Sequence, residues 1–304
     1  MKYAARAPLR IDFGGGWSDV PPFAQSDPDG GAVLNAAINL YATGYIIKPE
    51  EPSGLVDRMR GSGKNVVRYE LDAPAGAGLG ASAAQTLLWL TLVKTMIANV
   101  SERRELAERA WRVENELGIL GGRQDQYASA VGGINYMTFG SETTVEPLHP
   151  GFPFTDDFER RVVVAYMGGS RLSGDIHEHV WGRYAAGDPV VTDALRGLKR
   201  VATEMRSALL EKDLDKFGRL MNQNWEYQRQ LDASITNERV DLLVELALSS
   251  GAIGVKAAGA GGGGCLICLA EDGAERGLAA ALKESGAQTL PFEFDWYGVH
   301  LTKG

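Results

Sequence analysis

Three glycine-rich segments contain most of the residues of this chain that could do chemistry. Residues 74–84 read PAGAGLGASAA and run directly into an apolar stretch, residues 85–100. Glycines that open a helix expose backbone N–H groups at the positive end of the helix dipole, where a polyphosphate can bind. Residues 10–19 (RIDFGGGWSD) and 259–264 (GAGGGG) are similarly rich in glycine. One such segment is most simply a flexible loop before a buried helix, but three in one chain favour a nucleotide site.

Two other kinds of nucleotide site fit the glycines poorly. A P-loop needs a Lys-Ser or Lys-Thr step after its last glycine, and residues 74–84 have none. Gly76, Gly78 and Ala81 match a relaxed dinucleotide fingerprint, with Glu102 about 20 residues further on. The preceding residues, 68–72 (RYELD), are half polar, however, whereas the first strand of that fold is buried on both faces. An NAD-dependent dehydrogenase is therefore the weaker alternative.

Taken together, the three segments resemble the motifs of the GHMP kinases, the family of galactokinase, homoserine kinase, mevalonate kinase and phosphomevalonate kinase. The first motif, PxRxxxxGxxxD, is matched by Pro8, Arg10, Gly15 and Asp19. Residues 74–83 match the second, PxGxGLGSSA, except that Ala81 replaces its first serine. Residues 259–264 match the third, GAGxGG, so the motifs span nearly the whole chain in family order.

The resemblance implies an ATP-dependent kinase that uses Mg²⁺ and works by positioning its reactants and neutralising charge. Asp125, in GRQDQ, would be the general base, and Arg10 would stabilise the phosphoryl group or lower the pKa of Asp125. Ser82 and Glu114 would bind Mg²⁺, although Ser82 could be only a helix cap and Glu116 could replace Glu114. The phosphates would lie along the second and third motifs, at Gly76, Gly78, Leu79, Gly80, Ala81, Ser82, Ala83, Gly259, Gly261 and Gly262.

For the acceptor, the resemblance implies that Asp19 accepts hydrogen bonds from hydroxyl groups and that Trp17 forms a wall of the pocket. Further acceptor contacts are expected at Gly16, Ser18, Gln126 and Gly262. Structural salt bridges are the alternative roles of Arg10 and Asp19.

Residues 14–22, 30–35 and 124–126 are most similar to the branch of the family that phosphorylates the anomeric hydroxyl of a sugar. That branch includes D-glycero-D-manno-heptose 7-phosphate kinases and L-fucokinases. The sequence WSD followed by PP favours a fucokinase, while the length, with no appended transferase domain, favours a heptose phosphate kinase. We expect D-glycero-D-manno-heptose 7-phosphate as the acceptor, with L-fucokinase or a galactokinase-like sugar 1-kinase as alternatives. A catalytically silent sensor of nucleotide or sugar is a further alternative, favoured only by Ala81.

Several other residues invite chemical interpretations. Lys256, just before the third motif, could reach a phosphate or lie on the surface at a strand end. His177 and His179 lack an evident third metal ligand, so we interpret them as polar helix residues. The cysteines of CLICL, Cys265 and Cys268, lie three apart on an expected strand and should face opposite sides as core residues of a protein in a reducing cytoplasm.

Composition and charge limit the function further. The 304 residues are 44% hydrophobic and 23% charged, which predicts a soluble chain of two domains or one large one. A net charge of −8 provides no basic field for nucleic acid or an anionic membrane. The sequence has no apolar run of about 18 residues and no signal-peptide core at its start. These features predict a cytoplasmic protein whose partner is a small sugar or sugar phosphate; an oligomer is possible.

The expected architecture is α+β, because strands and helices mix without regular alternation. The resemblance implies an N-terminal domain like the second domain of ribosomal protein S5, a ferredoxin-like C-terminal domain and a cleft between them. Residues 142–157 are rich in Pro, Thr, Gly and acidic side chains, which places the domain boundary between 1–155 and 156–304. Expected strands cover residues 3–13, 32–47, 66–71, 134–139, 161–167, 255–258, 265–269, 289–294 and 298–302. Expected helices cover residues 82–100, 101–117, 124–131, 190–211, 213–230, 238–250 and 273–285.

Overall fold

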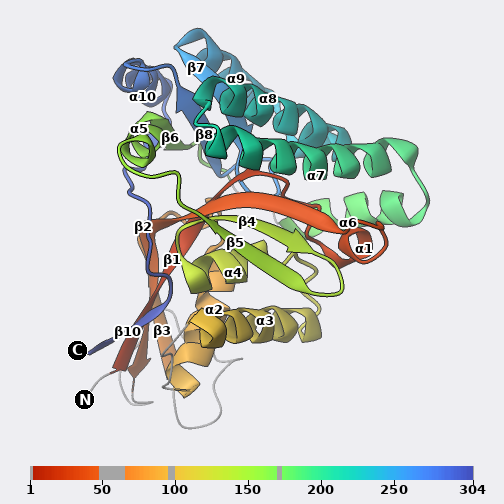
Figure 1. Ribbon diagram of the computed structural model, residues 1–304, viewed down its shortest axis with the longest axis vertical. Helices are drawn as coiled ribbons and strands as arrows, with labels where there is room; N and C mark the ends of the chain where they lie inside the picture. The colour runs from red at the N-terminus through yellow and green to blue at the C-terminus, as the bar shows by residue number, and fades with distance from the viewer. Residues whose placement is uncertain (1–2, 48–65, 95–99, 170–172, 304) are drawn as a thin grey trace.

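The computed structural model describes residues 3–47, 66–94, 100–169 and 173–303, and it contains two antiparallel β-sheets with helices packed against them (Figure 1). The first sheet has the strand order β10-β1-β2-β4-β5, with β3 pairing the far end of β2. Its strands are β1 (Tyr3–Gly14), β2 (Gly31–Ile47), β3 (Val66–Leu71), β4 (Ile134–Phe139), β5 (Thr143–Leu148) and β10 (His300–Lys303). The first half of the long strand β2 pairs with β4 and its second half with β3.

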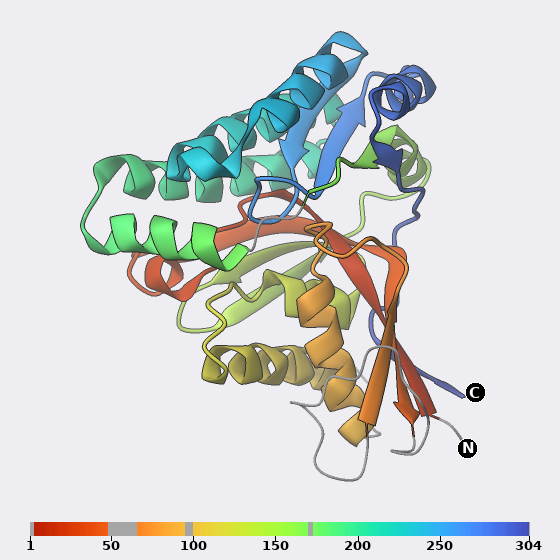
Figure 2. The ribbon, with the colours of Figure 1, turned by 180° about the vertical axis from the view of Figure 1, so that it is seen from behind.

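Helices cover both faces of the first sheet. On one side lie α2 (Ala81–Lys94), α3 (Val100–Glu116) and α4 (Gln124–Val131), and on the other lies α7 (Pro189–Leu210) (Figures 1 and 2). Leu9, Ile11 and Phe13 of β1 are fully buried, while the intervening residues of the strand point to its other face. Burial of this alternating apolar set fixes which face of β1 is turned to the core and leaves Arg10 and Asp12 on the opposite face.

The second sheet has the order β7-β8-β6-β9 and consists of β6 (Val162–Tyr166), β7 (Ala252–Ala257), β8 (Cys265–Ala270) and β9 (Gln288–Thr289). The other helices of the described residues are α1 (Pro21–Ala24), α5 (Phe154–Arg161), α6 (Ser173–Ala185), α8 (Leu214–Leu231), the 3-10 turn η1 (Ala233–Ile235), α9 (Glu238–Ser249) and α10 (Glu275–Glu284). Asp188, Asp213 and Asn237 cap α7, α8 and α9 through their side chains. The expected α+β architecture with two parts is confirmed.

Cys265 and Cys268 are both buried and both free, and they belong to different apolar clusters. The prediction that they face opposite sides of a strand is therefore confirmed.

Three expectations need correction. The dinucleotide-binding alternative is wrong, because β3, which precedes the second motif, pairs antiparallel with β2, whereas that fold is built on a parallel sheet. Residues 142–157 are not simply a connection: they contain β5 and the start of α5. Pro147 is tolerated in β5 because this strand lies at the edge of its sheet.

The third correction concerns the end of the chain. The strand expected at residues 289–294 shortens to β9, and Phe294 instead forms a bridge with Ile38 of β2. The last strand, β10, pairs with β1, so the two ends of the described chain lie together (Figure 1). The division at residue 155 stays a prediction, with β10 lying in the sheet of the first half.

Candidate active site

A cavity of about 780 Å³ lies where the three glycine motifs meet. Every predicted site residue except Ser18 and Gly262 lines it: Arg10, Gly16, Trp17, Asp19, Gly76, Gly78, Leu79, Gly80, Ala81, Ser82, Ala83, Glu114, Asp125, Gln126, Gly259 and Gly261. Residues far apart in the sequence thus form one cleft, although the assignment of a role to each stays a prediction.

The second and third motifs pack backbone against backbone, as Figure 2 shows near the start of α2. A Cβ on Gly78 would lie 2.8 Å from the carbonyl oxygen of Ala258, and one on Gly259 would lie 3.1 Å from Cα of Gly78. Gly76, Gly78 and Gly80 all have φ between +74° and +79°, which disfavours a side chain there. The contact brings the N-terminus of the 14-residue helix α2 to the cleft, where its N–H groups can bind phosphate. Ser82 lies in the first turn of α2, with its side chain exposed.

Arg10 joins the predicted base to the glycine loop before α2. Its Nε donates to Oδ1 of Asp125 at 2.8 Å, and its Nη1 donates to the carbonyl oxygen of Gly78 at 2.6 Å. The side chain of Arg10 is only 4% exposed, whereas that of Asp125 is 28% exposed. A Cβ on Gly80 would lie 3.4 Å from Oδ2 of Asp125, so this carboxylate sits directly over the glycine loop. A fixed cation and a partly accessible carboxylate beside a glycine loop and a helix N-terminus form an arrangement suited to phosphoryl transfer.

Asp19 lies deeper in the same cleft and is 2% exposed. Burial raises the pKa of Asp19 to about 7; the N–H of Gln124, which donates to Oδ2 at 3.1 Å, opposes this rise, and the carboxylates of Asp125 and Asp12 add to it. A Cβ on Gly122 would lie 1.7 Å from Oδ2 of Asp19. A glycine is thus needed at position 122, three residues before Asp125, to make room for the carboxylate of Asp19.

Glu114 is buried at the edge of the cleft between three helices. Its Oε1 accepts a hydrogen bond from Thr86 of α2 and its Oε2 one from Gln126 of α4, both at 2.7 Å. Glu116 is exposed and outside the cleft, so the structure favours Glu114 of the two candidates for a metal ligand. Among the described residues, no group of three or more His, Cys, Asp or Glu side chains could hold a metal by itself. One carboxylate and one hydroxyl nevertheless fit Mg²⁺, which in kinase sites takes most ligands from phosphates and water.

Trp17 and His177 form an aromatic wall. Trp17 has an uncommon positive φ of 79°, and its ring stacks on His177 with the centroids 4.3 Å apart. Trp181 donates to Nδ1 of His177 at 3.2 Å, and burial lowers the pKa of His177 to about 4. His177 and His179 lie on helix α6 as expected, but His177 also lines the cleft as a neutral ring, a role that the sequence interpretation missed.

Three other predictions need correction. The Ser18 hydroxyl is fully buried and contacts the backbone of Gly15 and Ala32, so it fixes a turn rather than facing the cleft. The N–H of Gly262 donates to the carbonyl oxygen of Ile235 at 2.6 Å, and its carbonyl oxygen accepts from the side-chain amide of Asn237 at 3.0 Å. These hydrogen bonds hold the third motif against η1 and the start of α9, and Gly262 does not line the cleft.

Lys256 neither lines the cleft nor lies on the surface. It is fully buried, and its Nζ donates to Oδ2 of Asp12 at 2.9 Å and to the carbonyl oxygen of Asp12 at 2.8 Å. Asp12 lines the cleft and was also missed. Strand alternation was the available signal, since it places Asp12 on the same face of β1 as Arg10.

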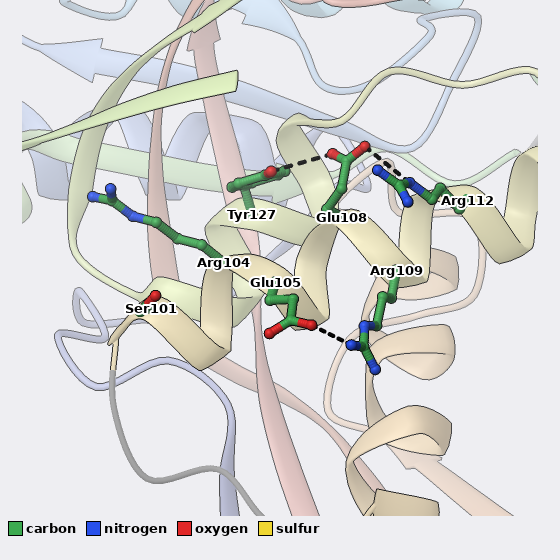
Figure 3. Close-up of a pocket in the computed structure, with 7 residues that line it drawn as sticks. All are labelled: Ser101, Arg104, Glu105, Glu108, Arg109, Arg112 and Tyr127. Atoms are coloured by element: carbon green, nitrogen blue, oxygen red, sulfur yellow. Dashed lines mark hydrogen bonds and ion pairs between the residues drawn. The ribbon is translucent and has the colours of Figure 1, made fainter. Parts of the chain in front are cut away.

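A second hollow, of about 500 Å³, lies on α3 away from the glycine motifs. Both of its glutamates are engaged: Glu105 pairs with Arg109, and Glu108 with Arg112 and Tyr127 (Figure 3). Its third arginine, Arg104, donates to the carbonyl oxygen of Val145. Because both carboxylates of the hollow are already paired and no glycine motif reaches it, it offers no comparable site.

Comparison with known proteins identifies the family of the chain. Residues 51–133 match the model of the GHMP kinases N terminal domain, and residues 205–288 match GHMP kinases C terminal, which together make up more than half of the chain. The chain therefore belongs to the GHMP kinase family, and it is an ATP-dependent phosphotransferase.

Particular relatives include sugar kinases. The chain is 28% identical to the D-glycero-alpha-D-manno-heptose 7-phosphate kinase of Campylobacter jejuni over 97% of both chains. It is also 28% identical to the bifunctional fucokinase/GDP-fucose pyrophosphorylase of Arabidopsis thaliana, over 87% of this chain but only 29% of that protein. A crystal structure of a D-glycero-D-manno-heptose 1-phosphate kinase from Bacteroides thetaiotaomicron superimposes with a TM-score of 0.73 at 25% identity, covering 99% of each chain.

None of the helices within the described ranges is long and apolar enough to cross a membrane.

Proposed function

We propose that this protein transfers the γ-phosphate of ATP to the anomeric hydroxyl of a sugar or sugar phosphate, with Mg²⁺ as cofactor. The main support is the position of the Arg10–Asp125 pair, which lies over the glycine loop before α2 (residues 76–80, the proposed phosphate loop) and beside the buried carboxylate Asp19. In this cleft the α2 N-terminus binds the triphosphate, and Asp19 orients the acceptor. Asp125 takes the proton of the attacking hydroxyl as its oxygen bonds to the γ-phosphorus. The bond from that phosphorus to the bridging oxygen breaks and ADP leaves, while Arg10 holds Asp125 in place. Mg²⁺, held by Glu114 and Ser82, would neutralise charge on the phosphates.

D-glycero-D-manno-heptose 7-phosphate is our first candidate acceptor, because the heptose 7-phosphate kinase relative aligns along nearly its whole length. A neutral sugar such as L-fucose is the second candidate. Among the described residues that line the cleft, Arg10 is the one Lys or Arg side chain, and it already contacts Asp125. The lack of a free basic side chain among these residues favours an acceptor sugar that carries no phosphate group of its own.

The direct test is an ADP-release assay with ATP, Mg²⁺ and a panel of D-glycero-D-manno-heptose 7-phosphate, L-fucose, D-galactose and D-mannose. We expect one of these sugars to stimulate ADP release, and phosphorus NMR to show the new phosphate coupled to the anomeric proton. Phosphorylation at another carbon would contradict the proposed regiochemistry. Calorimetric binding of ATP and sugar without ADP release would instead favour the sensor.

The assignment of the base is tested by Asp125→Asn, which should lower kcat by roughly 10²- to 10⁴-fold while the KM for ATP changes little. Asp193→Asn is the control, because this carboxylate is 78% exposed and lies on α7 outside the cleft. If Asp125→Asn turned over as fast as the Asp193→Asn control, Asp125 would not be the base.

A further inference from the structure

Asp12 is a buried carboxylate that the proposed mechanism does not yet use. The residue is 2% exposed, and Lys256 binds its Oδ2 and its carbonyl oxygen. Its other carboxylate oxygen, Oδ1, has no hydrogen-bond partner within the described part of the chain. Leaving a buried charged acceptor unpaired is costly, so a native protein that keeps one needs a reason for it.

The surroundings of Asp12 belong to the acceptor end of the cleft. A Cβ on Gly16 would lie 2.3 Å from Oδ2 of Asp12 and 3.0 Å from Nε2 of Gln124, so these side chains meet over Gly16. The Asp12 charge also raises the pKa of Asp19, which requires the two carboxylates to be near each other. Asp12 therefore lies beside the residues assigned to the acceptor and not along the phosphate loop.

Other buried polar atoms without partners belong to residues that line the same cleft. Within the described residues they include Nε1 of Trp17, Oε1 of Gln124 and Oε1 of Gln126, all from residues that line the cleft. Together with Oδ1 of Asp12, they provide one donor and three acceptors. A polyhydroxylated ligand offers hydroxyl groups that can satisfy both kinds of atom.

We propose that Asp12 determines acceptor specificity: its free Oδ1 accepts a hydrogen bond from a hydroxyl group of the sugar, and Lys256 positions its carboxylate. The inference rests on the proposed function and adds a contact to it. Because Lys256 lies on β7 and Asp12 on β1, the second sheet supports a carboxylate that the first sheet presents to the acceptor. A site built to bind a hydroxyl group discriminates strongly against analogues that lack it.

The alternative is that the ion pair merely holds the two sheets together. Asp12→Asn alone would not separate these roles, because it leaves the buried Lys256 without its counter-charge and destabilises the fold. The variant Asp12→Ala/Lys256→Met removes both charges, and replacing a buried ion pair by apolar groups is often tolerated. We expect this double variant to keep an unfolding midpoint near that of the wild type. Its KM for the acceptor should nevertheless rise by about 10- to 100-fold, with the KM for ATP within about 3-fold.

A second Asp–Lys pair in the chain serves as the matched control. Oδ1 of Asp27 lies 2.5 Å from Nζ of Lys199, and the side chain of Asp27 is 5% exposed. Neither residue lines the cleft. Asp27→Ala/Lys199→Met should leave both KM values within about 3-fold of the wild type. The most specific measurement compares kcat/KM for the accepted sugar with kcat/KM for each of its monodeoxy analogues. We expect the wild type to discriminate against one of them, and the Asp12→Ala/Lys256→Met variant to lose that discrimination.

Two outcomes would overturn the inference. One is a double variant whose acceptor KM stays within about 3-fold of the wild type, and the other is unchanged discrimination against every deoxy analogue. Failure of the proposed function is a separate result: the wild type itself would release no ADP with any sugar, and the inference would fall with it.

Discussion

Asp19 should make the protein less stable as the pH rises, because burial raises the pKa of this carboxyl from 3.8 to about 7. Between these two values the folded chain holds a proton that the unfolded chain has lost. The stabilisation is therefore complete below about pH 4 and is lost as the pH rises through 7. The difference of about three pH units corresponds to about 4 kcal/mol in the free energy of unfolding. Roughly 2 kcal/mol of this lies between pH 5.5 and pH 8.

Asp19→Asn removes the titrating group while keeping an oxygen that can accept the hydrogen bond from the N–H of Gln124. Thermal unfolding of the wild type and the variant would be followed by circular dichroism at pH 5.5 and pH 8 without ligands. We expect the midpoint of the wild type to fall by about 3 °C more than that of the variant over this range. At pH 8 the variant should be the more stable protein and yet bind the acceptor poorly.

Asp193→Asn serves again as the control and should reproduce the pH profile of the wild type, because its carboxylate is 78% exposed. The reasoning is refuted if Asp19→Asn shows the same pH dependence as the wild type. It is also refuted if that variant is less stable than the wild type at pH 8, since an ionised Asp19 would then be stabilising.

Three shorter predictions concern other parts of the cleft and the core. Gly80→Ala forces a side chain onto a residue with φ of +79°, so steady-state kinetics should show kcat/KM for ATP lowered by about 10-fold or more. Glu114→Gln should raise the Mg²⁺ concentration needed for half-maximal activity, whereas Glu116→Gln, on an exposed residue of the same helix, should not. Burial raises the pKa of Cys265 to about 12 and also raises that of Cys268, so intact mass should show no alkylation of native protein by iodoacetamide at pH 8.

The glycine loops of the site could be predicted from the sequence because the local backbone conformation requires glycine there. Gly78 and Gly80 need a positive φ, and the helix that follows them starts one residue after Gly80. These requirements place glycines at fixed positions before the helix, and this spacing can be recognised in the sequence without knowledge of the fold. The last residue of α4 and the first residue of β4 were predicted correctly for the same reason, because Gly132 and Gly133 separate them with positive φ angles.

The missed residues depend on contacts between distant segments. Lys256 meets Asp12 across 244 positions, and nothing in the residues next to either one signals the other. His177 reaches the cleft because α6 packs its ring on Trp17, which requires the placement of a helix against the first motif. The wrong prediction at Ser18 has a similar cause: its hydroxyl bonds to the backbone of Ala32, a turn contact that only the fold specifies.

The contact between the second and third motifs shows why the cleft needs both halves of the chain. Gly78 and Gly259 touch through their backbones, and the N–H of Cys265 in β8 donates to the carbonyl oxygen of Ala77 at 2.9 Å. The loop before α2 is therefore held by the second sheet, while Arg10 ties the same loop to Asp125 in the first half. A displacement of the second sheet would move the proposed phosphate loop relative to Asp125, the proposed base. Because reacting groups must be aligned to within about an ångström, such a displacement would lower the rate even with every residue of the cleft intact.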